Sequence, residues 1–177
     1  RNMSFAFKSG KMASNVLDSM LANAKASEAI KDGSLIKLGD LVTDEVYGDA
    51  EYDTYKAEKP AAGEEVVIAD YAGISEGAIA GNEYKLGVKL HDLMIPAGEI
   101  FRVRRLALHD KFWLGADNFD TVPTVGKYAA AEAGKYEHKI ADEKPVSGYA
   151  IKIIAEKGMT VGMKANGNIF LCEVVSL

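Results

Sequence analysis

The chain has few of the residues on which catalytic and metal centres most often depend. Its 177 residues include one cysteine and three histidines. A single cysteine cannot form an intrachain disulfide, so the sequence gives no sign of a fold built around an oxidising compartment. Cys172 stands in a β-rich apolar run, residues 169–175. This context predicts a small buried side chain in a strand rather than a nucleophile.

Long apolar runs and an excess of positive charge are also missing. No stretch approaches the roughly 18 apolar residues that a membrane-spanning helix requires. The chain has 26 acidic and 21 basic residues and a net charge of −5. This balance argues against nucleic acid as a partner and against binding to an anionic membrane surface.

Proline is scarce, but its placement is informative. Each of the four prolines is followed two or three residues later by a glycine, and a strand-like run comes next. Proline favours the first position of a turn, and glycine takes the positive φ that other residues resist. The pattern predicts a mainly β protein, an antiparallel sandwich or barrel. The four segments are Pro60–Gly63, Pro96–Gly98, Pro123–Gly126 and Pro145–Gly148.

Residues 1–33 differ from the rest and predict an N-terminal tail followed by a helical arm. From Ala13 to Ala24, apolar residues recur at the spacing of one helix face. The stripe is narrow and partly alanine, so it should dock on its own domain or on a neighbour. It supplies the candidate interface residues, which are Val16, Leu17, Met20 and Leu21.

From residue 34 to residue 177 the apolar period changes to two, which predicts a β-domain. Short strands are expected at 35–38, 64–71, 84–91, 99–109 and 149–155. In the fourth, Phe101 and Leu106 have opposite parity, so we expect a β-bulge at Arg104-Arg105. The last two strands should form a hairpin that turns at Asn166-Gly167, and the final strand should be central.

Motifs for metal or catalysis are weak. His91-Asp92 and His109-Asp110 are expected at strand ends, where polar caps are the simpler interpretation. Asp49, Glu51 and Asp53 have the spacing of a calcium loop, but Thr54 and Pro60 stand where glycine and glutamate are needed. A weak surface cation site stays open there. Residues 77–81 lack the lysine of a phosphate loop, and no G-x-S-x-G elbow is present. We therefore expect no enzyme, cofactor or resident metal.

Residues 111–120 place three aromatic rings, Phe112, Trp113 and Phe119, beside polar side chains. Such a platform can bind sugars by stacking and hydrogen bonding. The simpler interpretation is that Trp113 anchors the core or an interface. A carbohydrate-binding β-module is therefore the alternative function, and a β-barrel enzyme that uses His91, His109 or His138 is a third.

The order of elements resembles the small decoration, cement or head-fibre-base proteins of tailed bacteriophages. The resemblance is carried by the amphipathic segment Ser14–Lys31, by the strand opening at Asp32–Asp40, and by a glycine-punctuated β-domain that ends in the hairpin Gly158–Val175. It implies a non-enzymatic virion protein that assembles in the host cytoplasm and binds the outside of the capsid. The implied partners are the major capsid protein and further copies of the same chain.

Overall fold

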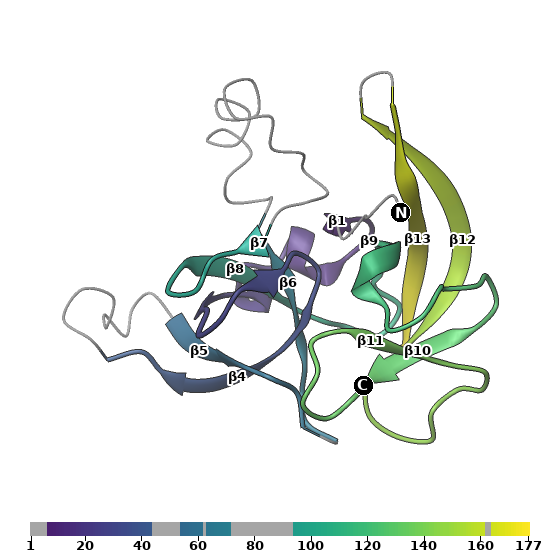
Figure 1. The fold of residues 1–177 in the computed structure, drawn as a ribbon. Coiled ribbons are helices and arrows are strands. Elements are labelled where there is room, and N and C mark those ends of the chain that lie inside the picture. Colours follow the sequence, from purple (N-terminus) through teal and green to yellow (C-terminus); the bar gives the residue numbers. More distant parts are fainter. Residues whose placement is uncertain (1–6, 44–53, 62, 72–93, 162–163) are drawn as a thin grey trace.

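A computed structural model describes residues 7–43, 54–61, 63–71, 94–161 and 164–177. The described chain is built of strands and three short 3-10 turns, so the expectation of a mainly β protein is confirmed. Two β units make up the fold, a six-stranded sheet and a small closed barrel. Figure 1 shows the barrel strands on one side and the long β12–β13 hairpin on the other.

The six-stranded sheet is antiparallel throughout, in the order β1-β9-β13-β12-β10-β11. The last strand of the chain, β13, pairs with β9 on one side and β12 on the other, so its expected central position is confirmed. The strands are β1 (Phe7–Ser9), β9 (Lys111–Gly115), β10 (Tyr128–Ala131), β11 (His138–Ala141), β12 (Ala150–Val161) and β13 (Lys164–Ser176).

The barrel closes in the order β2-β5-β4-β6-β8, and the pair β2–β5 is parallel. The expected alternative of a sandwich is not confirmed. A short pair, β3 (Ile30–Lys31) with β7 (Met94–Ile95), lies outside the barrel ladder. The barrel strands are β2 (Leu21–Lys25), β4 (Leu35–Leu41), β5 (Thr54–Glu58), β6 (Val67–Asp70) and β8 (Ile100–Arg105).

Two hydrophobic cores result, and strands β4 and β6 contribute to both. Ile36 and Val67 point into the barrel, while their neighbours Leu35 and Ile68 pack with the six-stranded sheet. All four side chains are at most 1% exposed. Because successive side chains of a strand point to opposite faces, a strand between two cores must be apolar on both. These strands hold the barrel and the sheet together.

The prediction that a glycine takes a positive φ in each proline–glycine turn is confirmed at all four sites. Gly63, Gly98, Gly126 and Gly148 have φ between 75° and 94°. This left-handed region is where a Cβ is disfavoured. The buried state predicted for Cys172 is also confirmed, since it is 0% exposed.

The helical arm predicted for residues 1–33 is wrong where the structure describes it. Residues 13–15 and 18–20 form single 3-10 turns, and residues 21–25 are strand β2 of the barrel. The alanines of this segment fit the period of a helix face as well as the period of a strand face. Ala22 and Ala24 alternate with half-buried residues and point into the barrel, where a five-stranded interior favours small side chains. Tertiary packing therefore overrides local helix propensity.

The β-bulge predicted at Arg104-Arg105 is also wrong. Strand β8 pairs with β2 and β6 in unbroken register up to Arg105. Phe101 and Val103 fill the barrel, whereas Leu106 packs into the other core. The apolar residues therefore change from one face of the chain to the other because the chain leaves the barrel core and enters the second core. No extra residue is inserted.

The C-terminal hairpin is confirmed, but its predicted turn is misplaced. Val161 pairs with Lys164, which puts Asn166-Gly167 inside strand β13. The position of the turn is therefore decided by strand pairing along β12 and β13 rather than by the turn preference of Asn166-Gly167. The strand predicted at 84–91, the pair His91-Asp92 and the carboxylates at 49, 51 and 53 lie outside the described residues.

Candidate functional site

A pocket of about 380 Å³ opens where the barrel meets the six-stranded sheet. Two of the proline–glycine turns meet at its edge. A Cβ on Gly148 would lie 4.0 Å from the Cα of Gly63, so the two turns are neighbours at van der Waals distance. The lining residues are Gly63, Glu64, Glu65, Val66, Leu106, Gly148, Tyr149 and Leu177.

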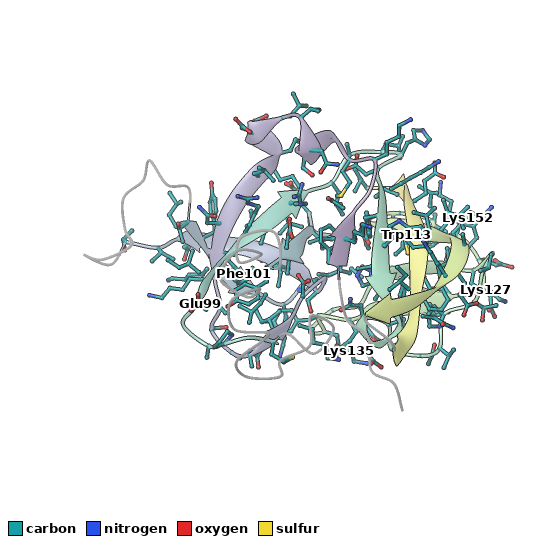
Figure 2. All side chains as sticks on the ribbon, turned by 90° about the horizontal axis from the view of Figure 1, so that it is seen from above. Glu99, Phe101, Trp113, Lys127, Lys135 and Lys152 are labelled. Carbon is teal, nitrogen blue, oxygen red and sulfur yellow. The ribbon has the colours of Figure 1, made fainter. Side chains whose placement is uncertain are left out.

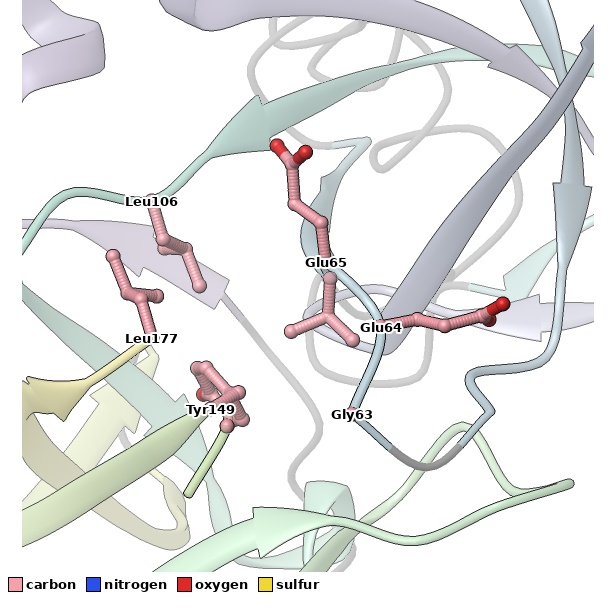
Figure 3. A pocket seen from close by; sticks show the side chains of 8 residues that line it. Gly63, Glu64, Glu65, Leu106, Tyr149 and Leu177 are labelled. Atoms are coloured by element: carbon pink, nitrogen blue, oxygen red, sulfur yellow. The ribbon is translucent and has the colours of Figure 1, made fainter.

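The pocket has apolar walls and an acidic rim. Leu106, Leu177 and the ring of Tyr149 lie on one side, and the carboxylate of Glu64 points away from them (Figure 3). Glu64 accepts a hydrogen bond from Lys37 at 2.9 Å, and Glu65 pairs with Arg105 at 3.4 Å. The lining set contains no serine, cysteine, histidine or lysine that could act as a nucleophile or general base. Its chemistry suits contact with an apolar group.

A buried hydrogen-bonded chain lies behind the pocket wall. The His138 Nε2 atom is 3.3 Å from the carbonyl oxygen of Gly33, and its Nδ1 atom is 3.3 Å from the Tyr149 hydroxyl. A carbonyl only accepts, so Nε2 carries the hydrogen and Nδ1 accepts from the tyrosine. Burial lowers the pKa of His138 to about 4, which keeps the ring neutral at physiological pH.

Gly33 and Asn118 pack closely beside this chain. Gly33 has φ +80°, and a Cβ there would lie 2.7 Å from the Asn118 Nδ2 atom. Asn118 is 1% exposed, and neither polar atom of its side chain has a hydrogen-bond partner among the described residues. The positive φ and this close approach favour glycine at position 33, and the contact holds the 3-10 turn 116–118 against the loop before β4.

Buried carboxylates join the sheet to the barrel. Asp32, which is 1% exposed, accepts the backbone N–H of Phe7 at 3.2 Å and that of Tyr71 at 2.9 Å. Phe7 belongs to sheet strand β1, and Tyr71 follows barrel strand β6. Burial raises the pKa of Asp32 to about 7, and the nearby Asp70 adds to the rise.

Arg104 fixes the N-terminal loop to the barrel. Its Nε atom donates to Asp70 at 2.5 Å, and its Nη1 atom donates to the Ser14 Oγ at 3.2 Å and the Asn15 Oδ1 at 3.0 Å. Arg104 is 8% exposed and Asp70 is 4% exposed. Buried charge pairs of this kind hold one geometry, because breaking them leaves an uncompensated charge.

Asp110 fixes the same loop from the other side. Its two oxygens accept the backbone N–H of Ala13 at 2.8 Å and that of Ala107 at 2.9 Å. The preceding residue, His109, has φ 71°, a conformation that non-glycine residues seldom adopt. The strand-end role predicted for His109-Asp110 is therefore confirmed. The segments 13–20 and 106–110 form one clamped loop pair.

The loop pair carries the predicted interface residues. Val16 is 81% exposed and Leu17 is 52% exposed, while Met20 and Leu21 are half-buried. The helix that was expected to align the four is absent, so they form no single stripe. Leu108, from the other segment of the pair, is 54% exposed. The sequence pattern placed none of Leu108, Arg104 and Asp110 at a contact surface, because only the fold joins their segments to residues 13–20.

The three aromatic rings do not form one platform. Phe112 is 0% exposed and Phe119 is 6% exposed, and both lie in the core shared with the sheet. Phe119 packs edge-on against Phe170 at 6.2 Å between ring centroids. Trp113 lies between two buried neighbours in β9 and is half-buried on the opposite face.

The remaining titratable groups offer little chemistry. Burial raises the pKa of the Cys172 thiol, so it stays protonated and unreactive. Within residues 7–43, 54–61, 63–71, 94–161 and 164–177, no three His, Cys, Asp or Glu side chains gather as a metal site requires. In the same ranges, no helix is long and apolar enough to cross a lipid bilayer.

The fold and these contacts define the chain as a two-unit β protein with a clamped loop pair and a pocket between the units. Comparison with known proteins adds no relative, because no family model, curated protein or solved structure matches the chain.

Proposed function

We propose that the chain is a non-enzymatic structural protein of a virus particle. It binds the outer surface of a tailed-bacteriophage capsid through the major capsid protein, and stabilises the shell or anchors a head fibre. It acts as a homo-oligomer on the capsid exterior after assembly in the host cytoplasm. In this role the protein uses no cofactor and binds neither nucleic acid nor a membrane.

The observation that carries the proposal is the exposure of Val16 and Leu17 on the clamped loop pair. Large apolar side chains that face solvent are typical of protein contact sites when they are held in place together. Both residues lie in the segment tied down by Arg104 and Asp110. A loop that is already ordered loses little conformational entropy on binding, so its apolar contacts contribute more to affinity.

Leu108 extends this contact surface across the loop pair. It lies two residues before Asp110, whose carboxylate joins the two segments. A partner that covers Val16 and Leu17 would therefore also meet the 106–110 segment. The pocket between barrel and sheet is consistent with the non-enzymatic part of the proposal, because its lining has no serine, cysteine, histidine or lysine and its two carboxylates, Glu64 and Glu65, pair with Lys37 and Arg105.

The test is binding to bare capsids. The purified chain should co-sediment with capsids that lack it and should raise the temperature at which they disrupt. Val16→Asp combined with Leu17→Asp should weaken binding at least about tenfold, since a contact residue at an interface centre contributes more than about 1 kcal/mol.

Val122→Asp is the matched control. Val122 is 79% exposed, close to Val16 at 81%, but it belongs to the loop between Asn118 and β10. Its substitution should leave co-sedimentation unchanged. The proposal is wrong if the unsubstituted chain neither co-sediments nor protects capsids. An equal loss in both variants would place the contact elsewhere.

A further inference from the structure

The side chains of the six-stranded sheet alternate between the core and an outer face. Phe112 and Leu114 are 0% exposed and face the core, so Trp113 between them points to the outer face. By the same alternation, Lys152 lies between the buried Ile151 and Ile153 and also points outward.

Strand register brings these side chains together in two rows. In one row, Lys111, Glu173, Lys152 and Tyr128 are successive partners across β9, β13, β12 and β10. In the next row, Lys8, Trp113 and Leu171 are partners across β1, β9 and β13. Directly paired side chains of an antiparallel sheet are about 5 Å apart, so the rows form one continuous patch.

The patch is positively charged although the chain carries a net charge of −5. Lys8, Lys111 and Lys152 contribute three ammonium groups. The carboxylate within the rows is that of Glu173, and it is already engaged. One of its oxygens is 3.1 Å from the His109 Nδ1 atom, and the other is 3.8 Å from the Lys111 Nζ atom.

Aromatic rings lie among these lysines. The Lys152 ammonium is 5.9 Å from the centroid of the Tyr128 ring, and Trp113 lies beside Lys8. Lys152 and Lys127 lie on the side of the sheet opposite to Phe101 of the barrel (Figure 2). In the part of the chain that the structure describes, the barrel does not cover this face, so a ligand can approach it.

We infer that this face binds acidic polysaccharide, a sugar chain that carries carboxylates. The Trp113 ring stacks on the apolar face of a sugar, and the ammonium groups of Lys8, Lys111 and Lys152 pair with its carboxylates. Trp113 and Lys152 lie two strands apart across the sheet and two residues apart along it, a span of roughly 12 Å, so neighbouring acidic sugars of one chain meet both groups. An open strand face suits an extended chain better than it suits a small molecule that needs a closed cavity.

Charge complementarity and the aromatic ring together favour this ligand over an acidic polypeptide and over a neutral polysaccharide. An acidic polypeptide would pair with the lysines but would leave the indole without a ring partner. A neutral polysaccharide would stack on Trp113 but would leave the lysines unpaired. The ligand must therefore supply both negative charge for the lysines and a sugar ring for Trp113. Its binding at this face is independent of capsid binding through the loop pair.

Trp113 is the single tryptophan of the chain, so it reports on its own site. Alginate, a polymer of uronic acids, should change the Trp113 emission and bind in a calorimetric titration. Binding should weaken as salt rises from 50 to 500 mM. Dextran, a neutral polysaccharide, and poly-glutamate, an acidic polypeptide, should bind at least about tenfold more weakly.

Lys152→Glu should weaken alginate binding at least about tenfold, because it reverses a charge at the centre of the patch. Lys56→Glu is the matched control. Lys56 is an exposed lysine of barrel strand β5, and its substitution should change affinity less than about twofold. Trp113→Ala, followed by calorimetry, should also weaken alginate binding while thermal unfolding stays cooperative.

Three results would overturn the inference. If alginate fails to bind, the face is not a glycan site. If poly-glutamate binds as tightly as alginate and alters Trp113 emission equally, the face recognises charge alone. If Lys56→Glu weakens binding as much as Lys152→Glu, the interaction is spread over the whole surface rather than placed on this face.

Discussion

At the scale of single residues, the buried titratable groups respond to pH in opposite directions. His138 has a folded pKa of about 4, below its ordinary value of 6.5, so the stability it contributes is complete above pH 6.5 and is lost as pH falls towards 4. Asp32 has a folded pKa of about 7, above its ordinary 3.8. Its buried carboxyl favours the folded state at acidic pH, and that contribution is lost as pH rises from 4 to 7.

Substitution of His138 separates the two effects. For His138→Gln, the stability advantage of the unsubstituted chain over the variant should shrink by about 3 kcal/mol between pH 7.5 and pH 4, since one pKa unit corresponds to about 1.4 kcal/mol. Urea unfolding of both proteins across this range measures the difference, and the contribution of Asp32 cancels. A difference that does not vary with pH would show that the ring does not stay neutral in the folded state.

At the scale of elements, the N-terminal loop depends on one buried cation. Arg104→Ala leaves Asp70 buried without that cation and removes the bonds to Ser14 and Asn15. It should lower the free energy of unfolding by about 3–5 kcal/mol. Denaturant unfolding, with far-UV circular dichroism as the signal, measures this loss.

The neighbouring Arg105 provides the control for Arg104. It pairs at 3.4 Å with Glu65, whose side chain is 74% exposed. Arg105→Ala should therefore change the free energy of unfolding by less than about 1 kcal/mol. If the two substitutions prove equally mild, the Arg104 cluster does not hold the loop. The milder Arg104→Lys should fall between them, because it keeps the charge and loses the planar fork of donors.

At the scale of elements, the local sequence pattern predicted some strands and missed others. Period-two runs located β4, β6, β8 and the first half of β12 to within a few residues, because side-chain alternation is a local property. The same method misassigned residues 21–25, where Ala22 and Ala24 fit a helix face as well as a strand face. The pattern also gave no strand at residues 54–58, where β5 completes the barrel. Parallel pairing of β5 with β2 has no signature in either segment alone.

At the scale of the whole molecule, the barrel and the sheet share a core. Leu35 and Ile68 come from barrel strands but pack with the sheet residues. Unfolding either unit would expose the other's apolar surface, so the two should unfold together.

The test compares a signal from the sheet alone with a signal from both units. Trp113 fluorescence reports on the six-stranded sheet, and far-UV circular dichroism reports on the strands of both units. The two transitions should coincide in denaturant. Ile68→Ala should shift both to lower denaturant, with a loss of about 2–5 kcal/mol, because it removes a side chain that lies in the shared core. Separate midpoints would contradict a shared core.

The candidate site also shows which features local sequence can predict and which it cannot. The sequence marked Val16 and Leu17 as contact residues through a helical spacing, but the structure forms 3-10 turns and strand β2 there. The sequence offered Trp113 as a ligand residue only as the alternative to an anchor of the core or an interface. It could not show that Arg104 and Asp110 hold the first pair, since those contacts join residues about 90 positions apart. Nor could it show that Phe112 and Phe119 turn inward, away from Trp113.

The sequence by itself determined that this is a β protein with glycine-bearing turns, because turn geometry and strand alternation depend on neighbouring residues. It also determined that Cys172 is buried and that the whole chain is acidic. Only the tertiary structure decided that the N-terminal segment is part of a barrel, that two cores share β4 and β6, and that lysines gather around Trp113. These features depend on pairing between distant segments, where the burial of apolar surface outweighs the preference of any one segment.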